Sequence, residues 1–348
     1  MAADNRDLHD ELRAVARDLL STERVDWSLM ARAGWIGLEA SESLGGADAS
    51  FAEVAVILDE IGRAAKPTPY LGGAVLAIGA LNTLEANDSR DQLLTAVSSG
   101  ATKVAVALPT DGGSRPRFRL DGSRLSGIAE FVPDAGDAEV VLLPAEDSDG
   151  TPVIVVLRAD AAGLVVTVQP VLDQTRRLAV VSVAGMAVGD AEVWRFDGDA
   201  QQAFGRLLDR ARVAVACDSL GLSETMLATT VSYVAVRQQF GRPIGSFQAV
   251  KHACADMLVQ IEVGRRLVEA AVDAVVQVSP DATTAALMAK SYVCAAAVDV
   301  IGTAMQLHGG IGYTWEGGVH VYLKRAALNR SLFGSPAAHR KQLAQRYL

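Results

Sequence analysis

The sequence predicts an α+β fold in three parts, with helical domains at both ends and a β domain between them. Apolar residues follow a helical period up to about Ser99, a strand-like period from Lys103, and a helical period again after Asp199. The length of 348 residues is long for one compact core and suits two or three packed subdomains. We therefore expect a helical domain over residues 1–102, an antiparallel β domain over 103–198 and a helical bundle over 199–348.

The N-terminal part carries apolar residues at helical spacing, first at Leu12 and Val15 and again over residues 51–61. Pro67 and Pro69 interrupt this pattern, because a proline has no backbone donor for a helix interior. The first third of the chain is therefore predicted to be helical, with a break at these prolines.

The middle part changes to short runs of β-branched residues, which are typical of strands. Stretches rich in Asp and Gly separate these runs, such as Asp121-Gly122 and residues 147–150, and they favour turns. The expected strands lie over residues 104–108, 140–143, 153–157, 164–168 and 178–183.

The C-terminal part returns to helical periodicity. One apolar stripe runs through Phe204, Leu207, Leu208, Ala211 and Val215. Two longer helical patterns follow over residues 248–276 and 282–307. Long helices that share apolar stripes pack together, so we expect a four-helix bundle that also carries the oligomer contacts.

Composition excludes several classes of protein. Half of the residues are hydrophobic and 21% are charged, which excludes a disordered chain. A net charge of -9 opposes binding to phosphate backbones or anionic membranes, so nucleic acid is not an expected partner. The apolar stretch over residues 293–305 contains Asp299 and is too short to cross a bilayer, so no membrane span is expected.

The cysteines, histidines and N-terminus point to a cytoplasmic protein without a metal. Cys217, Cys254 and Cys294 lie far apart and form no CxxC pair, which is typical of buried thiols in a reducing compartment. The five histidines show no paired ligand spacing on one helix face, so no metal site is expected. The charged, amphipathic N-terminus lacks the apolar core of a signal peptide.

Two segments of the C-terminal part carry the most specific signal. One reads Arg237-Gln238-Gln239-Phe240-Gly241-Arg242-Pro243-Ile244, with Phe247-Gln248 and a long helical pattern after it. The other reads Gln306-Leu307-His308-Gly309-Gly310-Ile311-Gly312-Tyr313-Thr314-Trp315-Glu316. At this separation, and after a helical-β-helical layout, the two segments resemble the signatures of the acyl-CoA dehydrogenases. The N-terminal part agrees through Ala33-Gly34-Trp35-Ile36-Gly37-Leu38 and Leu58-Asp59-Glu60-Ile61-Gly62-Arg63.

The resemblance implies an FAD-dependent oxidoreductase that acts on a CH–CH group. In this family a carboxylate removes the α-proton of an acyl-CoA thioester while the β-hydride goes to the flavin. Arg237 then faces the FAD diphosphate, because its guanidinium fork matches two phosphate oxygens. The other cofactor residues that the resemblance implies are Phe240, Gln248, Gln306, Gly309 and Gly310, and the family's residues at these positions reach the FAD of a neighbouring subunit.

Other interpretations of these residues stay open. Taken alone, the segment around Arg237 could be an ordinary helix end with a surface arginine. Residues 309–312 lack the preceding strand and the full spacing of a nicotinamide fingerprint. Arg212 either lines the acyl pocket, as the family implies, or is solvated with Asp209 as a surface partner. His308 is expected only to pack or to form a hydrogen bond.

The chain departs from the family at the catalytic base. Most members carry a Glu where this chain has Phe333, and a minority carry one where it has Ala211. Neither side chain can accept a proton, and general-base catalysis needs a carboxylate within hydrogen-bond reach. The flavin-holding segments differ as well, because the family's Thr-Glu-Pro loop is shortened to residues 108–113 and its Trp-Ile-Thr segment reads Phe131-Val132-Pro133.

The pattern of losses resembles the shorter, non-catalytic subunit of bacterial α2β2 acyl-CoA dehydrogenases that oxidise CoA thioesters of steroid side chains. The resemblance implies an acyl-CoA substrate, a Glu-bearing partner subunit, and an electron-transfer flavoprotein as a candidate electron acceptor. One alternative is a self-sufficient homo-oligomer with Asp209 or Glu316 as an atypical base. Another is a scaffold that keeps the fold without catalysis.

Overall fold

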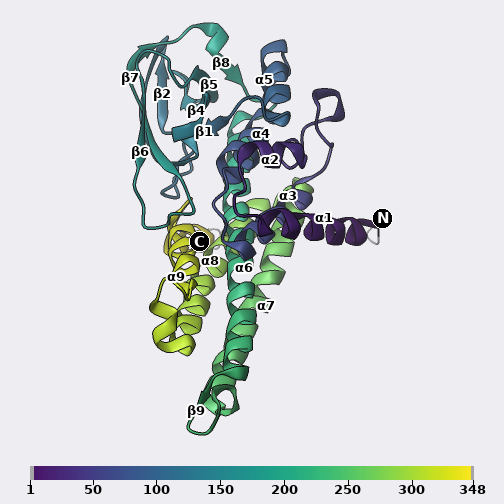
Figure 1. Cartoon of the computed structure of the whole chain (residues 1–348). Coiled ribbons are helices and arrows are strands. Elements are labelled where there is room, and N and C mark those ends of the chain that lie inside the picture. The colour runs from purple at the N-terminus through teal and green to yellow at the C-terminus, as the bar shows by residue number, and fades with distance from the viewer. Residues whose placement is uncertain (1–3, 346–348) are drawn as a thin grey trace.

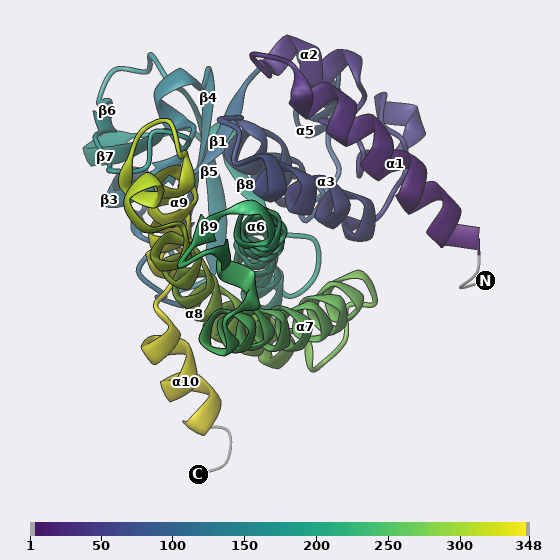
Figure 2. The ribbon, with the colours of Figure 1, turned by 60° about the horizontal axis from the view of Figure 1, so that its bottom comes forward.

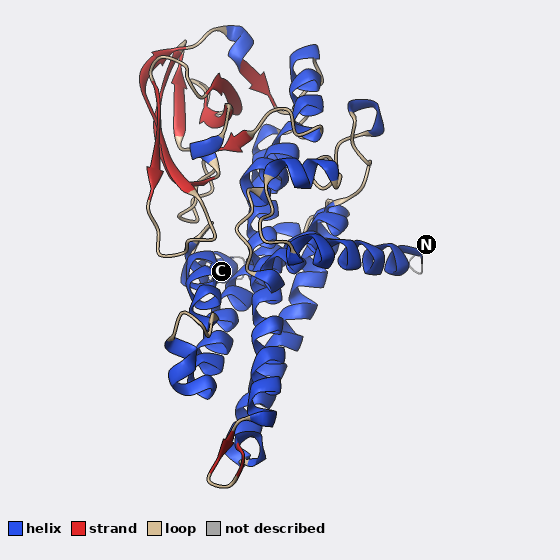
Figure 3. Cartoon of the chain, in the orientation of Figure 1, coloured by secondary structure: helices blue, strands red, loops and turns tan. Residues whose placement is uncertain are grey.

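A computed structural model describes residues 4–345 and shows helices at both ends of the chain and strands in the middle (Figure 1). The strands of the sheet gather at one end of the molecule, and the two longest helices meet in a small hairpin at the opposite end (Figure 3). The predicted α+β architecture is therefore confirmed.

The N-terminal helices are separated by turns. Their bounds are α1 Asp4–Ser21, α2 Trp27–Arg32, α3 Phe51–Ala64, a π-helical turn Leu71–Leu76, α4 Ala77–Leu81 and α5 Asp88–Ser98. A capping box starts α3, because the Ser50 hydroxyl accepts the Ala52 N–H and the Glu53 carboxylate accepts the Ser50 N–H at 2.8 Å.

The middle of the chain forms one eight-stranded sheet in the order β6-β7-β3-β2-β4-β5-β8, with β1 paired to β4. The strands are β1 Val104–Val106, β2 Phe118–Asp121, β3 Arg124–Pro133, β4 Val140–Glu146, β5 Pro152–Arg158, β6 Leu164–Gln169, β7 Leu178–Ala187 and β8 Val193–Arg195.

The expectation of a wholly antiparallel sheet is wrong, because β1 and β2 both run parallel to β4. Alternating hydrophobicity reports which face of a strand is buried and carries no information about strand direction. Parallel pairing needs a long connection, and the β2–β3 hairpin lies in the chain between β1 and β4 and provides it.

The C-terminal part is built on α6 Ala200–Val236, α7 Gln248–Val276, α8 Ala282–His308 and α9 Val319–Ser331. These helices lie side by side when the molecule is viewed from the hairpin end (Figure 2), as the predicted four-helix bundle requires. The short helix α10 Pro336–Gln345 packs on α8, and the two-residue strands β9 Gln238–Gln239 and β10 Arg242–Pro243 form the hairpin between α6 and α7.

The N-terminal helices and the bundle share one hydrophobic core. Helices α3 and α6 approach so closely that an added Cβ at Gly62 or at Gly221 would lie 2.1 Å from a carbonyl oxygen of the other helix. Only glycine fits at these two positions, so this contact fixes the N-terminal helices against the bundle. A second hydrophobic core is formed by apolar side chains of the β domain.

One helical stretch, Ala282–Tyr313, has the length and mean hydropathy, 1.5, of a membrane span. This stretch is longer than the apolar run anticipated from the sequence, and 56% of its apolar window is buried inside the protein. It includes Lys290, whose side chain is fully buried. The helix therefore serves as the central core helix of the bundle.

A buried ionic cluster joins the three parts of the chain. Asp218 on α6 is fully buried and accepts from Arg325 Nε on α9 at 2.9 Å and from Arg176 Nη2 at 2.7 Å. Asn329 Nδ2 donates to the same carboxylate at 3.0 Å, and Arg325 Nη1 donates to the carbonyl oxygen of Lys66 at 2.8 Å. Burial opposes ionisation, but the Arg325 and Arg176 charges hold the pKa of Asp218 below its usual value.

Candidate functional site

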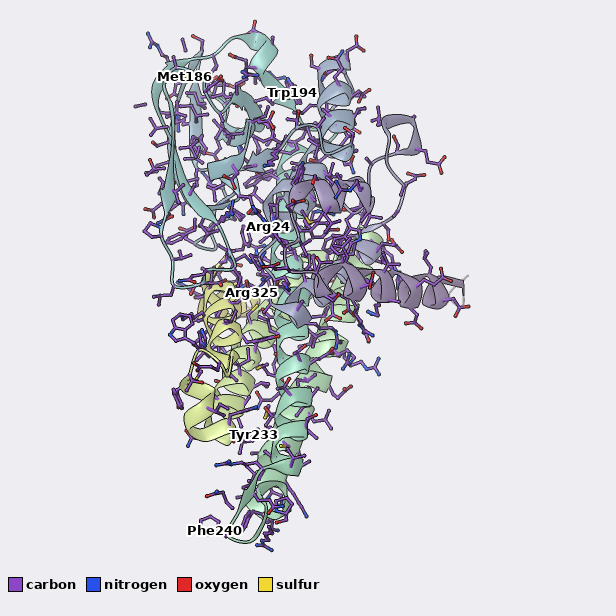
Figure 4. All side chains as sticks on the ribbon, in the orientation of Figure 1. Arg24, Met186, Trp194, Tyr233, Phe240 and Arg325 are labelled. Carbon is purple, nitrogen blue, oxygen red and sulfur yellow. The ribbon has the colours of Figure 1, made fainter. Side chains whose placement is uncertain are left out.

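The hairpin between α6 and α7 presents Phe240 to solvent at the far tip of the bundle (Figure 4). Phe240 is 91% exposed and, with Gly241, forms a two-residue turn in which both φ angles are positive, 52° and 76°. A left-handed phenylalanine costs about 1 to 3 kcal/mol, and its exposed ring gains nothing from the core. Such a strained and exposed ring indicates a contact with another molecule.

Arg237 stands at the base of this hairpin, directly after α6. Its backbone N–H donates to Tyr233 O at 2.9 Å and its carbonyl accepts from Ile244 N–H at 2.8 Å, so the backbone is fixed on both sides. Its guanidinium is exposed and forms no ion pair with any residue between 4 and 345. The backbone that carries this side chain is therefore fixed, and its guanidinium is free to bind an anion.

The end of α8 lies beside the end of α6. The Tyr233 ring stacks on the His308 ring, with centroids 4.5 Å apart and an interplanar angle of 18°. Gln306, Gly309 and Gly310 are exposed there, and an added Cβ at either glycine would meet nothing within 4 Å. This backbone is open to the approach of a flat or branched ligand.

All six residues assigned to the cofactor lie at this end of the bundle and are exposed. The sixth, Gln248, begins α7 immediately after Phe247, whose ring meets Phe240 edge-on at 6.0 Å. Met186 and Trp194 of the sheet lie at the opposite end of the molecule (Figure 4). The six residues therefore share no pocket with the β domain of their own chain.

The two segments that replace the family's flavin loop and base loop contact each other directly. Gly334 N–H donates to Thr110 O at 3.1 Å, and from the following helix α10 Gln342 Nε2 donates to Gly112 O at 3.2 Å. The buried Lys290 ammonium donates to Gly334 O at 3.0 Å and holds the second segment from behind. Loop 108–113 and residues 331–335 are thus held together by hydrogen bonds.

Both base positions are buried. Phe333 is 1% exposed and Ala211 is fully buried. A cavity of about 560 Å³ adjoins the fastened loops and is lined by residues that include Thr110, Arg117, Phe131, Leu328 and Leu332, and neither base position is among its lining residues. The acidic residues that line this cavity are Asp111 and Glu130, and neither stands at a base position of the family.

The end of β3 is fastened as well. Asp134 Oδ2 accepts the Gly72 N–H at 2.9 Å, and an added Cβ at Gly72 would lie 2.5 Å from Pro133 O. Burial raises the pKa of Asp134 to about 6. Residues 131–133 occupy the place of the family's Trp-Ile-Thr segment. The chain directly after Val132 therefore packs against the N-terminal helical part at Gly72.

Asp209 and Arg212 are buried, so the expectation of a surface pair is wrong. Asp209 is 3% exposed and accepts from Arg212 Nη1 at 2.8 Å and from Thr283 Oγ1 at 2.6 Å. The single apolar stripe seen in the sequence hid this burial, because α6 is surrounded by other elements on most of its sides. Burial raises the pKa of Asp209, while Glu316 is exposed in the turn before α9.

The sequence matches two domains of one protein family. Residues 5–101 match the acyl-CoA dehydrogenase N-terminal domain, and residues 201–348 match the acyl-CoA dehydrogenase C-terminal domain. The acyl-CoA dehydrogenase IpdE2 of Mycolicibacterium smegmatis is 31% identical over 336 residues, which cover 96% of this chain and 91% of the relative. The chain belongs to the acyl-CoA dehydrogenase family. The enzyme is accordingly an oxidoreductase that acts on a CH–CH group, and FAD is its cofactor.

Two solved structures similar to this acyl-CoA dehydrogenase each carry a pair of protein names. A variant of the Tcur3481-Tcur3483 steroid ACAD is 30% identical, with a TM-score of 0.85 and 97% coverage of each chain. The ChsE4-ChsE5 complex from Mycobacterium tuberculosis is 25% identical, with a TM-score of 0.85, and the match covers 98% of this chain and 96% of that one.

The exposed end of the bundle fits part of an FAD molecule. An unpaired guanidinium, two exposed amides and two bare glycines offer the donors and the close backbone approach that a diphosphate and its neighbouring groups need. Tyr233 and the cluster around Asp218 were not found from the sequence. A charge inside the apolar run Ala216-Cys217-Asp218-Ser219-Leu220 was the signal for the cluster, and the one-turn spacing from Tyr233 to Arg237 was the signal for Tyr233.

Proposed function

We propose that this chain is the base-lacking subunit of a divided acyl-CoA dehydrogenase, in which a partner chain supplies the catalytic carboxylate. One observation carries the proposal: loop 108–113 bonds to residues 331–335 with Phe333 buried, while every residue assigned to FAD is exposed at the other end of the bundle. Phe333 and Ala211 cannot accept a proton and are buried, so the carboxylate for general-base catalysis has to come from elsewhere. The proposal keeps domain boundaries at residues 102/103 and 198/199.

In the proposed complex this chain binds and orients the cofactor. FAD supplies the redox chemistry by accepting a hydride from the β-carbon of the acyl-CoA. The Arg237 guanidinium holds the FAD diphosphate, Gln248 and Gln306 offer amide hydrogen bonds, and Gly309 and Gly310 let the backbone come close. The Phe240 ring packs on the cofactor and excludes water from it. Removal of the α-proton falls to the partner's carboxylate.

The comparisons support a partner of the same fold and a bulky substrate. Two similar structures each carry a pair of protein names; one is called a complex and the other a steroid ACAD. We infer an α2β2 assembly that acts on the CoA thioester of a steroid side chain, with Arg212 contributing to the substrate site and an electron-transfer flavoprotein as the electron acceptor. A cytoplasmic location belongs to the same proposal, supported by three free cysteines at positions 217, 254 and 294.

A self-sufficient enzyme is the competing proposal, and one observation favours it. Asp209 has a raised pKa and lines a cavity of about 480 Å³ together with Arg206 and Thr283. However, both carboxylate oxygens already accept bonds, from Arg212 and from Thr283. No residue of loop 108–113 or of segment 131–133 lines that cavity. A proton acceptor there would be separated from the segments that stand for the flavin loop.

The stoichiometry of FAD decides between the two proposals. The chain is expressed alone and together with a Glu-bearing acyl-CoA dehydrogenase, and FAD is counted per chain by absorbance after gel filtration. We expect little flavin on the isolated chain and one FAD per pair of different chains in the complex. One FAD per copy of the isolated chain would support the self-sufficient enzyme instead.

Replacing Arg237 by Ala should weaken FAD binding by the assembled complex. Loss of a charged hydrogen-bonding partner costs roughly 1.5 to 3 kcal/mol, which corresponds to about a 10- to 150-fold higher Kd for FAD. Titration of the apo-complex with FAD measures this change. Arg266→Ala is the matched control, because Arg266 is 76% exposed on α7 and, within residues 4–345, pairs only with Glu269. Equal affinities for the two variants would remove Arg237 from the cofactor site.

A further inference from the structure

Tyr233 contacts both segments that reach toward the cofactor. Its carbonyl oxygen accepts the Arg237 N–H at 2.9 Å, at the base of the hairpin. Its hydroxyl donates to His308 O at 3.4 Å, and its ring stacks on the His308 ring. The two segments lie about seventy residues apart in the sequence. The Tyr233 backbone belongs to the end of α6 that leads into the first segment, and its side chain contacts the second.

The His308 ring is fixed on the α8 side of this bridge. His308 Nδ1 bonds with Ala304 O at 2.8 Å, and the imidazole is buried at 7% exposure. The next residue, Gly309, has a φ of 59° and turns the chain out of the helix toward solvent. The position of the open glycine backbone therefore depends on where His308 is held.

We infer that Tyr233 is a positioning residue that sets the distance between Arg237 and the Gln306–Gly310 turn, so that both engage one FAD molecule. This inference rests on the proposed function. A diphosphate and the groups beside it have a fixed size, and two protein segments bind them together only when their spacing matches. Without the Tyr233 side chain each segment keeps its own hydrogen-bond donors. The distance and orientation between the two segments are no longer fixed.

The test compares Tyr233→Leu, which removes the ring and the hydroxyl, with Tyr233→Phe, which keeps the ring. In the assembled complex we expect Tyr233→Leu to raise the Kd for FAD on the order of 10- to 100-fold. Tyr233→Phe should restore most of the affinity and remain within about 2- to 10-fold of the unmodified complex.

Tyr322→Phe is the matched control. The Tyr322 hydroxyl also donates to a backbone carbonyl, that of Arg63 at 3.1 Å, but away from both segments. It should lower the melting temperature about as much as Tyr233→Phe and leave the Kd for FAD unchanged. If Tyr233→Leu changes FAD affinity no more than Tyr322→Phe does, the positioning role is overturned.

Amide hydrogen exchange separates this inference from the proposed function, because it needs only the isolated chain. Tyr233→Leu should speed exchange at residues 237–244 and 306–310 together, whereas Tyr322→Phe should speed neither. If Tyr233→Leu speeds exchange in both segments but Arg237→Ala leaves the FAD affinity of the complex unchanged, the cofactor site is refuted. The bridge between the two segments then still stands. Exchange that is unchanged in both segments would refute the bridge.

Discussion

Purified without a partner, this chain is expected to show negligible desaturation of any acyl-CoA, whereas a complex with a Glu-bearing homologue should be active. The physical reason is that Phe333 and Ala211 cannot accept a proton and are buried. Changing the partner's catalytic Glu to Gln should lower kcat on the order of 100- to 10,000-fold, which is the usual contribution of a positioned general base. Formation of enoyl-CoA, followed by absorbance with an artificial electron acceptor, measures the rate.

Two variants of this chain control the experiment. Phe333→Leu keeps an apolar side chain at the base position and should leave the rate of the complex unchanged. Phe333→Glu should not create activity in the isolated chain, because this position is buried and is not among the residues that line the cavity beside loop 108–113. A carboxylate at this buried position should instead lower stability. Robust turnover by the isolated chain would return Asp209 or Glu316 to consideration as the base.

Short-range sequence patterns predicted the parts of the site that depend on short-range structure. The segment around Arg237 and the turn after Gln306 are each one continuous stretch, so their residue types and order already suggest their chemistry. The helical bundle followed from apolar periodicity for the same reason. Whether these six residues bind FAD stays a prediction until the affinity measurements are made.

Features that depend on contacts between distant residues could not be predicted. Asp218 meets Arg325 across 107 positions and Arg176 across 42, and no local pattern encodes those pairings. The prediction of strand direction failed for a similar reason, since β1 and β4 pair in parallel and the β2–β3 hairpin lies between them in the sequence. The burial of Asp209 and Arg212 reflects the central place of α6, which depends on packing by the rest of the chain.

Arg325→Ala should cost the isolated chain about 3 kcal/mol of unfolding free energy or more, because it leaves the fully buried Asp218 with one fewer cation. Breaking a buried pair by removing one partner typically costs about 3 to 5 kcal/mol, and the remaining Arg176 keeps the loss near the lower value. Unfolding in urea, followed by circular dichroism, measures the change. Arg266→Ala serves as the control, since its exposed pair with Glu269 should contribute at most about 1 kcal/mol.

The pH dependence of stability tests the same cluster through the carboxylate. Because the pKa of Asp218 is lowered in the folded protein, its ionised form stabilises the fold above the unfolded pKa of about 3.9. That contribution is lost as the pH falls through the lower folded pKa. Asp218→Asn should therefore lower the free energy of unfolding most at neutral pH. Its difference from the unmodified chain should shrink on acidification. A difference that stays constant from pH 7 to pH 3 would show that Asp218 does not stabilise the fold through its charge.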